Sequence, residues 1–254
     1  MEDTALTRVK IVLVEPAGAL NVGAIARVMK NMGLRQLVLV NPQCDPLGEE
    51  GRKMAVHAAD LLETAQVVAT LPQALTGCQR AIATTARCRT LTTELEEPRT
   101  ALPWLLIPSG VSALIFGPED RGLSNTELNY AQRFVRIPSH ADYPSLNLAQ
   151  SVGICSYELS QAAQNTELVA SPQIDVAPLD VLEQYYQQME AVLLKMGYLY
   201  PHTASSRMQK LRRLFNRTHV SQEELAMLRG IFSQMEWALQ YLPPSVSAKL
   251  DASN

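Results

Sequence analysis

Long apolar stretches are absent from this sequence of 254 residues, and it contains no low-complexity tract or internal repeat. No uninterrupted apolar segment approaches the ~20 residues needed to cross a bilayer, so we expect no membrane contact. The first residues, Met-Glu-Asp-Thr, lack the basic flank and the apolar core of a signal peptide. These absences favour a cytoplasmic protein.

Cysteine is scarce, and its positions do not suit a metal. The four cysteines, at positions 44, 78, 88 and 155, form no C-x-x-C pair, and no histidine completes the spacing of a structural zinc site. We therefore expect free thiols and no bound metal.

Motifs of the common nucleotide-dependent enzymes are missing as well. Gly18 and Gly23 have the spacing of a phosphate-binding loop, but Ala24 and Ile25 stand where that loop needs Lys and Ser or Thr. No G-x-G-x-x-G follows a predicted strand, and no G-x-S-x-G is present. Nothing in these motifs supports an NTPase, a Rossmann dinucleotide site or a serine hydrolase.

The composition is that of an ordinary globular protein, with 47% hydrophobic and 19% charged residues. The 22 Lys and Arg residues are outnumbered by 25 Asp and Glu residues, which gives a formal net charge of -3. A chain with this balance has no global attraction for a polyanion, so any basic site must be local.

Short apolar runs alternate with helical patterns through the first 160 residues. The first run, Val9–Val14, is almost continuously apolar, which is typical of a strand buried on both faces. Such alternation predicts an α/β fold with a mostly parallel sheet covered by helices. The predicted strands are Val9–Val14, Leu37–Val40, Val67–Ala69, Ala81–Thr84, Ala113–Phe116 and Phe134–Ile137, and the predicted helices are one from an Asn21 cap to Gly33, Arg52–Leu62, Pro98–Leu106, Ser124–Ala131 and one starting near Leu146.

The composition and the hydrophobic pattern of the sequence change after residue 164. Residues 165–178 combine Pro172 and Pro178 with small and polar residues, which predicts a linker between a domain at 1–164 and an extension at 179–254. No strand-like run follows the linker. The extension is expected to be helical, with helices over Leu179–Gly197, Ala204–Phe215 and Ser221–Tyr241.

Positive charge is concentrated in this extension. No carboxylate occurs between Glu190 and Glu223, and the cations there are Lys195, Arg207, Lys210, Arg212, Arg213 and Arg217. Clustered cations release counterions from a phosphate backbone, so the stretch is a candidate nucleic-acid surface, with a solvated basic face as the alternative. The residues expected to form the buried stripe of the same helix are Met208, Leu211, Leu214 and Phe215.

Three motifs lie at the carboxyl ends of predicted strands, where open α/β sheets place their ligands. The first, N-V-G-A-I-A-R, runs from Asn21 to Arg27, which lies about one and a half turns into the predicted helix. The second is F-G-P-E-D-R-G-L-S-N-T-E-L at residues 116–128, in which Ser124 and Glu127 have the spacing of a capping box. The third, I-P-S-H-A-D-Y-P-S-L-N-L at residues 137–148, is a polar loop before a helix.

Together these motifs resemble the SPOUT superfamily of S-adenosylmethionine-dependent RNA methyltransferases, in the branch that methylates ribose 2'-hydroxyls. The resemblance covers residues 9 to about 160. The extension, with K-L-R-R-L-F at 210–215 and M-L-R-G-I at 227–231, is similar to that of the TrmJ group, which modifies nucleotide 32 in the tRNA anticodon loop.

The resemblance implies a C-terminal trefoil knot in the α/β domain, a homodimer, tRNA as partner and S-adenosylmethionine as cofactor. The residues that it assigns to the cofactor are Thr84, Thr85, Ala86, Gly117, Glu119, Gly122, Ile137, Pro144, Ser145 and Leu146. The residues that it assigns to catalysis are Arg27, reaching the cofactor of the partner subunit, and Asn21, Glu119, Ser145 and Asn147. The RNA-binding candidates are Arg207, Lys210, Arg212, Arg213 and Arg217.

Two questions stay open at this point. The motifs are shared across the branch, so methylation of another RNA such as rRNA is an alternative, and so is an RNA-binding dimer without activity. The role of Arg27 is the second question: as a guanidinium with a pKa above ~12 it is a poor proton acceptor, so we expect it to stabilise the developing alkoxide.

Overall fold

The computed structural model describes residues 5–86, 95–108, 110–140, 142–165 and 176–241. The chain divides into two compact units, Met1–Gln173 and Ile174–Asn254, and the boundary falls inside the predicted linker. Most of that linker, residues 166–175, lies outside the described residues. Its last residues belong to the second unit, because Val176 bridges to Ser221 and the backbone N–H of Ala177 donates to Val220 O (2.9 Å).

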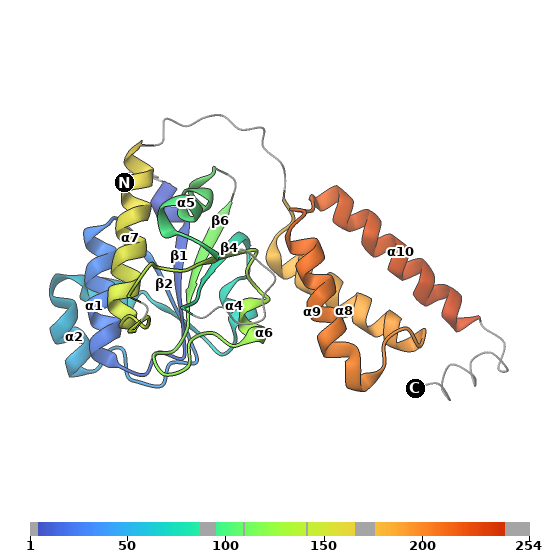
Figure 1. The fold of residues 1–254 in the computed structure, drawn as a ribbon, viewed down its shortest axis with the longest axis horizontal. Coiled ribbons are helices and arrows are strands. Elements are labelled where there is room, and N and C mark those ends of the chain that lie inside the picture. Colours follow the sequence, from blue (N-terminus) through green and yellow to red (C-terminus); the bar gives the residue numbers. More distant parts are fainter. Residues whose placement is uncertain (1–4, 87–94, 109, 141, 166–175, 242–254) are drawn as a thin grey trace. The chain divides into compact units, whose positions relative to one another are not determined.

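The first unit contains a sheet of seven strands in the order β3-β2-β1-β6-β4-β7-β5, with every pair parallel (Figure 1). β1 lies in the interior of the sheet, and Val12 pairs with Val38 on one side and Ile115 on the other. The strands are β1 Val9–Val14, β2 Gln36–Val40, β3 Gln66–Val68, β4 Cys78–Thr84, β5 Leu95–Glu96, β6 Val111–Phe116 and β7 Arg133–Val135. The predicted parallel α/β fold is confirmed.

Helices cover the sheet, with α1, α2 and α7 gathered on one side of it (Figure 1). The core there is built from alternate β1 side chains, Val9, Ile11 and Leu13, packed with apolar residues of α1 and α7. The elements of this unit outside the sheet are η1 Ala5–Arg8, α1 Ala19–Asn31, α2 Glu49–Ala55, η2 Val56–Ala58, α3 Ala59–Glu63, α4 Leu71–Ala74, α5 Pro98–Ala101, η3 Leu102–Leu106, α6 Asn125–Leu128 and α7 Leu148–Asn165.

Three predicted helix starts lie three residues after the observed ones: the Asn21 cap against a Gly18 cap, Arg52 against Glu49 and Ala204 against Pro201. Helix α1 begins at Ala19 with Gly18 at its N-cap, so Asn21 lies within the first turn and does not cap the helix. Helix α7 begins at Leu148, two residues after Leu146, and Asn147 accepts hydrogen bonds from the backbone N–H groups of the second and third helical residues. The capping role predicted for Asn21 is therefore performed, at a different helix, by Asn147.

The second unit is a set of three helices, α8 Leu179–Lys195, α9 Pro201–Asn216 and α10 Gln222–Gln240. Its core residues include Tyr185, Tyr186, Met189, Met208 and Leu225. Leu214 was expected in the buried stripe of α9, but its side chain is 48% exposed. No helix within the described part of the chain is long and apolar enough to span a membrane.

Candidate active site

A pocket opens at the carboxyl ends of β4, β6 and β7, and it brings together all ten residues predicted to contact a cofactor. About 850 Å³ of space in and around it, including its open mouth and adjoining solvent, holds no protein atom. The segments that line it are 84–86 after β4, 116–123 at the end of β6, 135 and 137 at β7, and 144–146, 148 and 151 at the start of α7.

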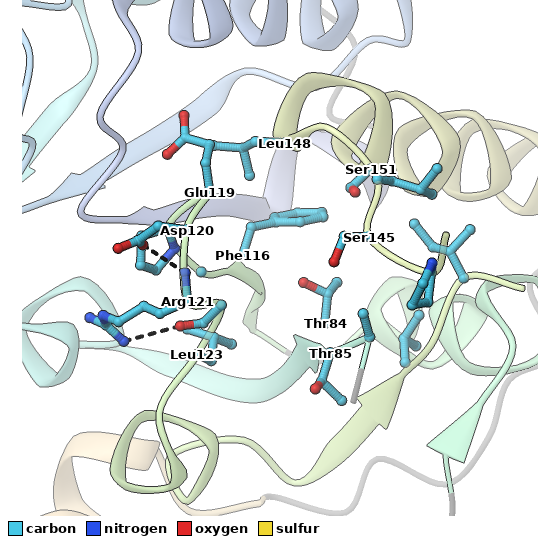
Figure 2. Close-up of a pocket in the computed structure, with 18 residues that line it drawn as sticks. Thr84, Thr85, Phe116, Glu119, Asp120, Arg121, Leu123, Ser145, Leu148 and Ser151 are labelled. Atoms are coloured by element: carbon cyan, nitrogen blue, oxygen red, sulfur yellow. Dashed lines mark hydrogen bonds between the residues drawn. The ribbon is translucent and has the colours of Figure 1, made fainter. Parts of the chain in front are cut away.

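The loop after β6 forms one wall of the pocket. A Cβ at Gly117 would stand 2.3 Å from the backbone nitrogen of Leu123, and Gly122 has a φ of +66°. Both glycines are needed because the chain folds back tightly on itself between them. Asp120, Arg121 and Leu123 lie on one side of the pocket and Thr84, Thr85 and Ser145 on the other (Figure 2).

Three of the predicted catalytic side chains are connected in series. The side-chain amide of Asn147 donates to Asn21 Oδ1 (3.0 Å), and Asn21 Nδ2 donates to Glu119 Oε1 (2.8 Å). The other carboxylate oxygen, Glu119 Oε2, accepts from the backbone N–H of Ala17 (3.1 Å). The structure therefore assembles the Asn21 and 137–148 motifs around the carboxylate of the 116–128 motif, within one chain.

Arg121 fastens the same loop to two other elements. Its guanidinium donates to Glu127 on α6 (Nη1–Oε2 2.9 Å) and to Glu15 at the end of β1 (Nη2–Oε2 2.6 Å). Glu127 also accepts from the backbone N–H of Ser124 (2.6 Å), in the predicted capping box. Burial by itself raises the pKa of Glu127, but hydrogen bonds from Arg121 and Ser124 outweigh it and hold that pKa below its ordinary value.

Glu15 and Asn41 adopt the left-handed backbone conformation, with φ of 47° and 45°, although neither is glycine. They follow adjacent strands, and Asn41 Nδ2 donates to Glu15 Oε1 (3.2 Å). Such conformations cost on the order of 1–3 kcal/mol and persist where the surroundings enforce them. The turn at Glu15 is followed by Ala17, whose backbone N–H donates to Glu119. Glu15 also accepts from Arg121, so the turn is bonded to the loop after β6 at two points, Glu119 and Arg121.

Sequence reasoning missed the roles of Arg121, Glu15 and Asn41. Arg121 lies inside a recognised motif, but its partner Glu15 is 106 residues away and no local pattern connects them. Among the described residues, no three potential metal ligands cluster, and Cys44, Cys78 and Cys155 are free thiols. Cys88 lies outside the described residues.

Arg27 lies on α1 outside the pocket lining of its own chain. It is exposed on α1, six residues after Asn21, and it is absent from the pocket lining that the described residues form. Of the other four predicted catalytic residues, Glu119 and Ser145 line the pocket. Asn21 is bonded to Glu119, and Asn147 is bonded to Asn21.

The five candidate RNA-binding residues lie on α9 and at its end. Their surroundings differ: Arg207, Lys210 and Arg217 are exposed, whereas Arg212 and Arg213 are half-buried. Arg212 forms an ion pair with Glu183 on α8, each side chain 15% exposed, and its guanidinium lies 4.6 Å from the ring centre of Tyr186. This arrangement holds α8 to α9 and gives Arg212 a structural role, while its phosphate contact stays a prediction.

Known proteins share both units of this chain. A sequence profile of the SpoU rRNA methylase family matches residues 8–157, and a profile of the C-terminal domain of tRNA methyltransferase TrmJ matches residues 180–244. The chain belongs to the SpoU rRNA methylase family. The resemblance drawn from the three motifs and from the extension is confirmed.

Individual relatives match nearly the whole chain. The tRNA (cytidine/uridine/adenosine-2'-O-)-methyltransferase TrmJ of Pseudomonas aeruginosa (strain UCBPP-PA14) is 38% identical over 244 residues, which are 91% of this chain and 95% of the relative. The crystal structure of TrmJ from Z. mobilis ZM4 is 31% identical with a TM-score of 0.80, and the match covers 89% of this chain and 98% of that one. An AdoMet-bound rRNA methyltransferase from Sinorhizobium meliloti, 24% identical with a TM-score of 0.51 over 61% of this chain and 56% of that one, shares the fold.

Proposed function

We propose that this chain transfers a methyl group from S-adenosylmethionine to a ribose 2'-hydroxyl of tRNA, at nucleotide 32 of the anticodon loop. The observation that carries the proposal is the assembly of three separate motifs into one pocket, with Asn147, Asn21 and Glu119 bonded in series at its edge. The relatives at 31–38% identity are named for this activity class or for TrmJ, which supports the choice of substrate.

The residues of the pocket fit the cofactor. Apolar walls at Phe116, Val135 and Leu148 suit an adenine ring, and Glu119 and Asp120 suit a ligand that carries positive charge on sulfur and nitrogen. When bound, S-adenosylmethionine supplies an electrophilic methyl group. The segments that would hold it are 84–86, 117–122, 137 and 144–146.

The side chains of the protein then have two tasks. The first is alignment of the ribose hydroxyl with the methyl group, which in favourable cases lowers a barrier by ~7–11 kcal/mol and exceeds the usual ~10²–10⁴-fold contribution of acid–base catalysis. Asn21, Glu119 and Asn147 perform this task through their fixed orientation. The second is stabilisation of negative charge on the attacking oxygen, which we assign to Arg27.

We infer that Arg27 acts in the pocket of a second copy of the chain. Arg27 is exposed and does not line the pocket of its own chain, and the helices α1 and α7, which pack together, expose the apolar side chains Leu20, Ile154 and Tyr157. Apolar side chains on neighbouring helices favour burial against another protein surface. A homodimer through α1 and α7 accounts for both observations.

The trefoil knot and the location in the cytoplasm belong to the same proposal. The knot is supported by family membership and by the meeting of segments 84–86, 117–122 and 144–146 at one pocket, as expected where the chain passes through its own loop. The second unit is proposed to bind tRNA, since it matches the TrmJ C-terminal domain and carries exposed cations on α9. A protein that methylates tRNA is proposed to act in the cytoplasm, because its substrate is found there.

The experiment that tests the function is incubation of the protein with methyl-labelled cofactor and, separately, bulk tRNA and rRNA. Blocked 2'-hydroxyls, mapped by resistance to alkaline cleavage, are expected at nucleotide 32 of tRNA. Label in rRNA alone would favour the alternative substrate. Heat of cofactor binding without transfer to either RNA would contradict the proposed activity, and no heat at all would favour the non-catalytic RNA-binding dimer.

Replacement of Arg121 with leucine tests the positioning network. We expect about a tenfold loss of cofactor affinity and a decrease of about 1–3 kcal/mol in the free energy of unfolding, because Glu15 and Glu127 lose a shared, half-buried partner. Calorimetry with S-adenosylmethionine and urea denaturation measure the two effects. Arg99→Leu is the matched control, since Arg99 is 81% exposed and pairs with Glu158, and neither residue lines the pocket. Unchanged cofactor affinity in Arg121→Leu would limit the network to stability.

A further inference from the structure

Aromatic side chains gather where α8 connects to α9. Tyr198 is 59% exposed, His202 is exposed and Tyr200 is half-buried, all within five residues of chain. A large ring left in water at a helix connection does not contribute to the core of the unit. Other rings of this unit, such as Tyr241, are exposed as well, so the surroundings of Tyr198 decide whether it binds a ligand.

The exposed ring of Tyr198 is held in place by Arg207. The guanidinium donates through Nη1 to the backbone carbonyl of Tyr198 (2.8 Å) and lies 5.8 Å from the centre of its ring. Two residues further along the chain, the rings of Tyr200 and His202 stack at 5.9 Å with an interplanar angle of 25°. Side chains that are already ordered lose little conformational entropy when a ligand binds.

The charge around this ring favours an anionic partner. Tyr198 and Arg207 lie in the stretch without carboxylates, and Lys210, one turn beyond Arg207 on α9, is exposed. Two other cations of the stretch are neutralised inside the unit, Lys195 by Glu236 and Arg212 by Glu183. The cations next to Tyr198 thus remain available for phosphate, unlike those that bind neighbouring helices.

We propose that Tyr198, backed by Arg207, is a stacking platform for an unpaired base of the tRNA. The proposal rests on the tRNA substrate proposed above and adds a recognition mode to it. An aromatic face beside guanidinium and ammonium groups is the chemistry that binds single-stranded RNA, because every base offers a π-face and every linkage a negative charge. A paired stem shields its bases, so the platform selects a loop.

The full-length protein without cofactor is titrated with a fluorescent anticodon stem-loop RNA and with a fully paired duplex of equal length. Tyr198→Ala is expected to weaken binding to the stem-loop about tenfold and to leave duplex binding unchanged. Tyr198→Trp is expected to keep the wild-type affinity. Because a stacking contact displaces no counterion, the slope of log K against log salt stays constant in Tyr198→Ala, whereas Lys210→Ala reduces it by about 0.7–0.9 for both RNAs.

Tyr241→Ala is the matched control. Tyr241 is 70% exposed and pairs with Trp237 at the end of α10, a helix that carries Glu223, Glu224 and Glu236 against a single Arg229. Its replacement is expected to change neither affinity. Equal losses in Tyr198→Ala and Tyr241→Ala, an equal loss on the duplex, or wild-type affinity in Tyr198→Ala would each overturn the platform.

The binding experiment separates this inference from the proposed function. Loop-specific weakening in Tyr198→Ala supports the platform even if no 2'-hydroxyl is methylated. Full methylation of tRNA together with wild-type loop affinity in Tyr198→Ala refutes the platform and leaves the activity in place. A urea midpoint equal to that of the wild type verifies that the variant is folded.

Discussion

Replacing Arg27 with alanine is expected to lower the rate of methyl transfer to tRNA by about 10²–10³-fold, the usual effect of removing one electrostatic stabiliser of a developing anion. Affinity for S-adenosylmethionine is expected to stay at the wild-type value, because the negative charge assigned to Arg27 develops on the attacking ribose oxygen only during methyl transfer. Single-turnover kinetics measures the rate, and calorimetry measures the affinity.

Lys30→Ala is the control for a cation on the same helix. Lys30 is exposed and pairs with Asp60, so its loss should leave the transfer rate intact. Wild-type turnover in Arg27→Ala would remove the arginine from the mechanism. A parallel loss of cofactor affinity would instead place it at the cofactor.

A mixing experiment decides which subunit provides Arg27. Arg27→Ala is combined with a variant that cannot bind the cofactor, and the subunits are exchanged. If Arg27 acts across the interface, each mixed dimer regains one complete site, and random mixing restores about a quarter of the wild-type activity. If Arg27 acts within its own chain, the mixture stays as inactive as its components.

Gly117→Ala is expected to have the second large effect, a loss of cofactor affinity of about 10²-fold. The added Cβ would lie 2.3 Å from the backbone nitrogen of Leu123 and 2.5 Å from the carbonyl carbon of Gly122, so the loop must move away from the pocket. A displacement of about 1 Å in a positioned group is enough for a loss of this size. Calorimetry with S-adenosylmethionine measures the change.

Gly230→Ala is the control for a glycine with space around it. No heavy atom lies within 4 Å of a Cβ built at Gly230, in the interior of α10, and alanine there is expected to raise stability by about 0.5–1 kcal/mol. Cofactor affinity should not change. Wild-type affinity for S-adenosylmethionine in Gly117→Ala would show that the loop can move without weakening cofactor binding, and that its tight turn is not required.

The bounds of β1 were predicted well from the sequence. β1 was predicted as Val9–Val14 and has those bounds, because a strand buried on both faces must be apolar along its whole length. β5, with only Leu95 and Glu96, was missed because two residues carry no periodicity. Its position depends on Arg133, which pairs with Glu96 from the neighbouring strand 37 residues away.

At the site, too, some features were predicted from the sequence and others were not. The family resemblance carried by the three motifs predicted the lining of the pocket, and the motifs meet there because strands of a parallel sheet deliver their carboxyl ends to one edge. The pairing of Asn21 with Glu119 spans 98 residues, and that of Arg212 with Glu183 spans 29. Local rules place each residue on an element, but only the packed fold decides which polar groups meet.

The series from Asn147 through Asn21 to Glu119 has a direction, because each amide offers its oxygen to one neighbour and its nitrogen to the other. Deamidation at Asn21 would exchange that nitrogen for oxygen and set two carboxylates against each other where 2.8 Å now separates donor and acceptor. A change of one atom at Asn21 would thus turn attraction into repulsion beside the pocket, so the order of the series depends on the amide of Asn21.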